Sequence, residues 1–107
     1  MDQISAAAPT AKHGVAVDFG AIELTGSLHH DDAQRDLVLL TDEGPERVSV
    51  SLQGYGLVPA PGRVFVKDWS EHSGLAQRLQ EAGLARIVGS VVVGPFSSTA
   101  YEVEVTL

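Results

Sequence analysis

Apolar residues recur at every second position in several short stretches of the chain, which is the pattern of β-strands with one buried face. Residues 47–53 show it most clearly, because apolar and polar side chains alternate there without interruption. The apolar stretch 37–41 before it has the length of a strand, and Gly44 and Pro45 between the two are typical of a turn. We therefore predict a hairpin over 37–53.

Other stretches share this strand-like pattern. The sequence predicts a first pair over 15–17 and 21–25, a strand over 63–67, a bent strand over 87–93, and a last strand over 101–107. The bend in the strand over 87–93 is expected at Gly89 and Ser90. The polar stretch 27–36 has no apolar alternation that stands out, and we predict a loop there.

One helix is predicted among these strands, over residues 69–82. Apolar residues recur there at three- and four-residue spacing, and Gly83 follows in the position where helices commonly end. Asp68 has the character of an N-cap, because Glu71 lies three residues later and can complete a capping box.

This order of strands, one helix and further strands predicts an α+β domain. One helix cannot cover both faces of a large sheet, so we expect a curved, mainly antiparallel sheet of about six strands, half-closed into a barrel, with the helix packed on it. A right-handed crossover between parallel strands is an alternative for residues 63–93. We expect a single domain over 14–107 after a disordered tail over 1–13, which is rich in Ala, Pro, Ser and Thr.

Composition and charge exclude several classes of function. The chain of 107 residues has a formal net charge of −7, and nine acidic against three basic residues before Arg63 account for −6 of it. This negative field disfavours direct binding to nucleic acid or to anionic membranes, and it favours a basic partner. The chain has no cysteine, which excludes disulfides and thiolate chemistry. Its start does not resemble a secretion signal, and no apolar stretch is long enough to cross a bilayer, so we expect a cytoplasmic protein.

Two groups of residues have side chains suited to chemistry. His29, His30, Asp31 and Asp32 are of the types that bind zinc and related ions, but adjacent side chains diverge and seldom bind one ion together. We therefore predict no metal site there.

A separate loop, over 94–99, could present Phe96 at its tip, although its composition is that of an ordinary turn.

The second group is Lys67, Asp68, Trp69, Ser70, Glu71 and His72, at the predicted joint between strand and helix. It contains the residue types of nucleophilic catalysis, but a catalytic triad is assembled from distant segments, and the chain has neither a GxSxG elbow nor a phosphate-binding loop. We predict no catalytic residue and no cofactor. Capping and packing explain most of these residues, and the group is otherwise a candidate binding surface around Trp69.

The C-terminal half of the chain resembles a family of small proteins from bacteria, phages and mobile elements. The resemblance rests on the strand VFVK, on Trp69-Ser70-Glu71 that opens a helix, and on Ala82-Gly83 that closes it. His72 and Ser73 depart from the pattern, in which amide or acidic residues are expected. The resemblance implies no activity and no functional residue, and it agrees with a structural capping role for this segment.

The sequence leads us to expect a non-enzymatic accessory or interaction protein that acts through protein–protein contacts, either with itself or with a larger partner. Its terminal strands could extend a sheet by edge pairing. One alternative is a small-ligand-binding domain or minor enzyme with a pocket near Trp69 and His72. Another is an acidic inhibitor that mimics nucleic acid, which requires that carboxylates lie on one face, among them Asp31, Asp32, Asp42 and Glu43.

Overall fold

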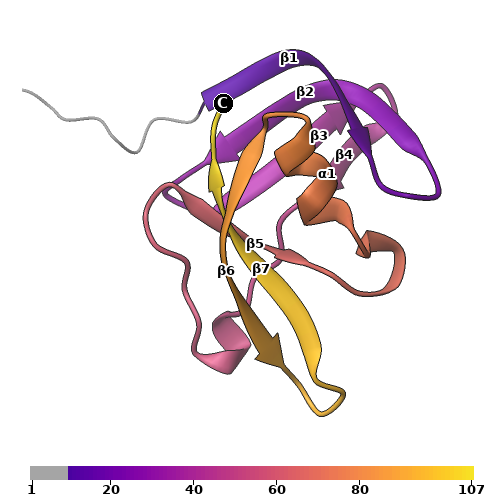
Figure 1. Ribbon diagram of the computed structural model, residues 1–107. Helices are drawn as coiled ribbons and strands as arrows, with labels where there is room; N and C mark the ends of the chain where they lie inside the picture. Colours follow the sequence, from indigo (N-terminus) through magenta and orange to yellow (C-terminus); the bar gives the residue numbers. More distant parts are fainter. Residues whose placement is uncertain (1–9) are drawn as a thin grey trace, which may run out of the picture.

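The computed structural model describes residues 10–107, apart from the side chain of Glu71, and shows two antiparallel sheets and one α-helix (Figure 1). The first sheet is a meander of four strands in chain order: β1 (Thr10–Asp18), β2 (Glu23–Asp31), β3 (Asp36–Thr41) and β4 (Gly44–Arg47). The second has three strands in the order β5-β7-β6: β5 (Arg63–Lys67), β6 (Ala85–Val93) and β7 (Ser98–Val105). Three helical segments complete the fold: the 3₁₀ turns η1 (Gln53–Tyr55) and η2 (Ser70–His72), and the helix α1 (Leu75–Glu81).

The predicted α+β class, with antiparallel strands and one α-helix, is confirmed. Its seven strands are divided between two open sheets instead of about six in one curved sheet. β5 and β6 both pair antiparallel with β7, so they point in the same direction but are separated by it. The connection through α1 is therefore a crossover between parallel strands that are not neighbours.

The second sheet contributes buried side chains on both of its faces. Val64, Val66 and Val103 belong to the main core, which also contains the inward residues of β1 to β3 and the apolar side of α1. Phe65 and Ala100 belong to a smaller cluster on the opposite face. This division follows from the alternation of side chains along a strand.

The segments on either side of the predicted strand over 37–41 differ from the structure. The prediction of a loop over 27–36 is wrong for residues 27–31, because β2 continues through them to Asp31 and turns Leu28 and His30 inward. The predicted strand over 47–53 is also wrong, since the fourth strand is β4, which ends at Arg47. The amides of Val48 and Ser49 both donate to the carbonyl of Leu37, and the chain then leaves the sheet.

The helix is shorter than predicted, and its expected capping box is wrong. The Oδ1 of Asp68 accepts a hydrogen bond from the amide of Gly74 at 2.6 Å, six residues later. Gly74 adopts a φ of 80°, which breaks the helical path between η2 and α1. The predicted end at Gly83 is confirmed by its φ of 75° and its amide bond to the carbonyl of Gln80.

The N-terminal strand starts earlier than the sequence indicates. β1 includes Thr10 to His13, which the sequence assigns to the tail, and the rest of that tail lies outside the described residues. Among residues 10–107, no helix is long and apolar enough to cross a membrane.

Candidate functional site

The N-terminal strand β1 has an open edge. It lies at the end of its sheet, and within residues 10–107 no other strand pairs with its outer side. The amide of Phe19 donates to the carbonyl of Ile22 at 2.9 Å, which closes the β1–β2 turn. Because antiparallel ladders alternate between bonded and non-bonded pairs, Ala16 and Asp18 direct their backbone groups away from β2. The backbone amides and carbonyls of these two residues therefore lie on the open side of the strand.

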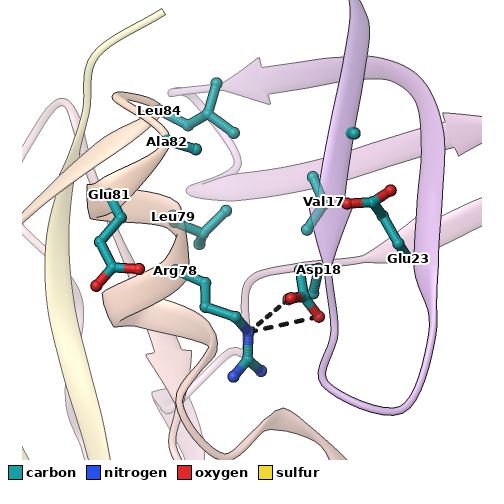
Figure 2. A pocket seen from close by; sticks show the side chains of 9 residues that line it. Val17, Asp18, Glu23, Arg78, Leu79, Glu81, Ala82 and Leu84 are labelled. Atoms are coloured by element: carbon teal, nitrogen blue, oxygen red, sulfur yellow. Dashed lines mark hydrogen bonds and ion pairs between the residues drawn. The ribbon is translucent and has the colours of Figure 1, made fainter.

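A hollow of about 330 Å³ lies between this edge and α1 (Figure 2). Its apolar lining comes from Ala16, Val17, Leu79, Ala82 and Leu84. A second hollow of about 170 Å³ adjoins it along β1, because Ala16, Ala82 and Leu84 line both. Together the two hollows follow the open edge.

Arg78 connects α1 to the end of this edge. Its Nε donates a hydrogen bond to the main-chain carbonyl of Asp18 at 2.8 Å, and lies 3.7 Å from the Oδ1 of the same residue. Figure 2 shows the side chain reaching from the helix across to β1. The outward carbonyl of Asp18 is thus satisfied within the domain, whereas no hydrogen bond from residues 10–107 engages the outward backbone groups of Ala16.

The hollow is acidic at its rim. Asp18, Glu23 and Glu81 line it, and Arg78 is the one cation among the described lining residues. Glu23 and Glu81 are exposed, and among the described residues no cation lies within 4.0 Å of either carboxylate. Lys12 lines the adjoining hollow at the other end of β1.

Five of the six residues from Lys67 to His72 have described side chains, and these five lie outside the hollow and face different parts of the domain. Trp69 is half-buried against the smaller cluster, with the Nζ of Lys67 5.8 Å from its ring centre. The ring of His72 contacts Phe19 instead, with 5.8 Å between ring centres. The Oδ1 of Asp68 accepts the hydrogen bond from the amide of Gly74, and Ser70 is exposed with a φ of 55°. A pocket near Trp69 and His72 was the expectation, and the hollow beside β1 contains neither residue.

The two histidines of the first candidate group point to opposite faces of β2. His30 is 8% exposed, and its Nε2 has no hydrogen-bond partner among the residues that the structure describes and lies 3.9 Å from the Oδ1 of Asp32. Burial lowers the pKa of His30, while the carboxylates of Asp32 and Asp31 oppose this shift. Nowhere in the described chain do three or more His, Asp or Glu side chains gather as metal ligands.

The acidic residues named for nucleic-acid mimicry do not lie together. Asp31 ends β2 and Asp32 follows it, whereas Asp42 and Glu43 follow β3 at its other end. The length of β3 therefore separates the two pairs. Asp32 is also engaged inside the domain, because its Oδ1 accepts a hydrogen bond from the amide of Gly62 at 2.6 Å.

A second exposed surface lies at the turn between β6 and β7. Phe96 is 88% exposed there, and Val92 on β6 is 64% exposed. The sequence correctly places Phe96 at the tip of a turn. Neither residue lines any of the hollows described beside β1 and α1.

In comparisons with models of protein families, with curated proteins and with solved structures, the chain matches none. The structure thus defines an α+β domain with an open strand edge beside an acidic hollow. Sequence reasoning missed this combination, although it singled out the terminal strands for edge pairing. The C-terminal strand β7 lies in the middle of its sheet, which makes that half of the expectation wrong.

Proposed function

We propose that this domain is a non-enzymatic interaction module that binds an extended segment of another protein along the open edge of β1. The observation that carries the proposal is the open backbone at Ala16 beside a hollow with an apolar lining. In such strand addition, main-chain hydrogen bonds supply affinity and the neighbouring pockets supply selectivity.

The usable part of the edge is short. The pairing of β1 with β2 is regular from Val15 to Asp18, and its register shifts between Lys12 and Val15. Bulges and lysines are devices that protect edges from uncontrolled pairing. The open backbone of Ala16 lies next to the hollow, which suits a selective contact better than general aggregation.

The alternatives have weaker support. The hollow contains three carboxylates, whereas pockets for small apolar ligands are mostly hydrophobic with few polar groups. The mimicry of nucleic acid requires one acidic face, and the carboxylates named for it lie at the two ends of β3.

A library of displayed peptides tests this proposal. Peptides selected on the wild-type domain are measured again on Ala16→Pro, in which the outward amide is removed while the β1–β2 ladder keeps its hydrogen bonds. We expect the selected peptides to lose at least tenfold in affinity on Ala16→Pro and to keep it on Phe96→Ser. Peptides that bind the wild type and Ala16→Pro equally would overturn the proposal.

A second variant avoids any dependence on proline. Ala82 is exposed at the C-cap of α1, with ordinary right-handed backbone angles, so Ala82→Leu fills the hollow without backbone strain. The matched control is Gln77→Leu, an exposed position of α1 that does not line the hollow. We expect only Ala82→Leu to weaken the selected peptides.

A further inference from the structure

From the charges around the hollow, we infer that the bound segment is basic: an extended stretch of protein in which Lys or Arg alternates with aliphatic residues. This inference rests on the proposed function and adds the chemistry of the partner to it. Three observations support it, namely the unneutralised carboxylates, the size and lining of the hollow, and the net charge of the chain.

The carboxylates of Glu23 and Glu81 are the first observation. Both line the hollow, and in the described part of the chain neither has a cation within ion-pair distance. Arg78 is already shared with the backbone and side chain of Asp18, whose side chain is 52% exposed. A cation on the partner would meet the carboxylates of Asp18 and Glu23 on the strand side of the hollow and that of Glu81 on α1. The one guanidinium there, that of Arg78, is already bonded to Asp18.

The apolar lining is the second observation. Val17, Leu79 and Leu84 are nearly inaccessible and lie at the base, whereas Ala16 and Ala82 are exposed and small. An apolar cavity of about 150 Å³ holds a benzene-sized group. A hollow of about 330 Å³ therefore accepts one branched aliphatic side chain with room for the strand that carries it.

Electrostatic attraction over longer distances acts in the same direction. The chain has a net charge of −7, so a basic segment is attracted and an acidic one is repelled before contact. A second copy of this chain is the competing occupant, because antiparallel pairing of two β1 strands would bring Lys12 of one towards Asp18 of the other. The overall repulsion between two such chains disfavours it.

Three synthetic peptides distinguish these possibilities. Each is about eight residues long, the length of an ordinary strand, and alternates Val with Lys, with Gln or with Glu. Binding is measured by calorimetry, and its location by amide shifts in NMR spectra. We expect the Lys peptide to bind at β1 and α1 at least tenfold more tightly than the Gln peptide, and the Glu peptide not to bind. The advantage of Lys should shrink when the salt concentration rises.

Charge variants show whether the hollow itself is responsible. Glu23→Gln combined with Glu81→Gln should reduce the advantage of Lys over Gln at least threefold. Glu46→Gln is the control, because Glu46 is an exposed carboxylate on β4, at the opposite edge of the first sheet. Equal losses in the two variants would mean a general attraction to an acidic protein and would overturn the inference.

The failure of the inference can be separated from the failure of the proposed function. If the Lys and Gln peptides bind equally and both are weakened by Ala16→Pro, the inference is wrong and the proposed function holds. If the peptides leave the signals of β1 and α1 unchanged, both are wrong. A wild-type dimer that Ala16→Pro abolishes would identify a second copy as the occupant and would also overturn the inference.

Discussion

Arg78 on α1 and Asp18 on β1 are 60 residues apart in the chain and are joined by a 2.8 Å hydrogen bond from Nε to the main-chain carbonyl. The same guanidinium donates from Nη2 to the carbonyl of Ser73 at 3.0 Å. Arg78 thus fixes the start of α1 against the end of β1. It also occupies the outward carbonyl of Asp18, so the backbone of Ala16 is the position beside the hollow at which we expect an added strand to pair.

Removal of this link should destabilise the domain. For Arg78→Met, which keeps an unbranched apolar stem, we expect the free energy of unfolding to fall by about 1 kcal/mol, the usual value of a hydrogen bond at a partly exposed site. Urea denaturation measures this change.

Arg86→Met is the matched control for this experiment. Arg86 pairs with Glu104 between exposed side chains, and pairs of this kind contribute little to stability. We expect no measurable change for this variant. Equal losses for Arg78→Met and Arg86→Met would show that the contact of Arg78 with Asp18 has no special role.

Gly26 allows β2 and β3 to pair closely. A Cβ atom at this position would lie 2.0 Å from the carbonyl oxygen of Leu40, and backbone atoms cannot rotate away as a side chain can. We expect Gly26→Ala to reduce the free energy of unfolding by about 2 kcal/mol, as overpacking commonly does. Thermal or urea unfolding provides the measurement.

Gly54→Ala provides the comparison, because a Cβ atom there meets nothing within 4 Å and Gly54 has no positive φ. This variant should be neutral or slightly stabilising. If Gly26→Ala were equally harmless, the close approach of β2 and β3 at this point would be incorrect.

The buried imidazole of His30 should make stability depend on pH. Its pKa is lowered in the folded protein, chiefly by burial, so the unfolded chain binds the proton more readily. The stabilising effect of neutral His30 is fully present above the ordinary histidine pKa of about 6.5 and decreases as the pH falls below it. We expect His30→Gln to flatten the stability profile between about pH 7 and pH 5.

Stability is measured by urea unfolding across this range, with His29→Gln as the neighbouring control. His29 is half-buried on the opposite face of β2, so the comparison shows whether the flattening belongs to the buried position of His30. An NMR titration that places the pKa of His30 above that of an unfolded-chain histidine would contradict this account.

Local patterns in the sequence predicted several elements correctly. Alternating apolar residues located β5 and β7, and Gly83 marked the end of α1. The irregularity in β6 was predicted at Gly89 and Ser90 and lies just before them, between Ile87 and Gly89. These features depend on neighbours in the chain. The α+β class followed from the same patterns.

Features that depend on distant contacts were not predicted. The sequence predicts a loop over the second half of β2 because one of its inward positions is His30, a polar residue that the core nonetheless accepts. The predicted helix begins too early, because the side chain of Asp68 accepts a hydrogen bond from the amide of Gly74 instead of capping a first turn at Trp69. The open edge of β1 and the hollow beside α1 arise only when β1 and α1 pack together, and no local pattern contains that information.

The exchange of the Ala16 backbone amide with deuterium tests the central claim most directly. In the free domain this amide should exchange rapidly, while the neighbouring amides of Val15 and Val17, which face β2, exchange slowly. When the Lys peptide is bound, we expect the exchange at Ala16 to slow at least tenfold, because an added strand accepts its hydrogen bond. An Ala16 amide that is already protected in the free domain, or that stays unprotected in the complex, would contradict binding at the edge of β1.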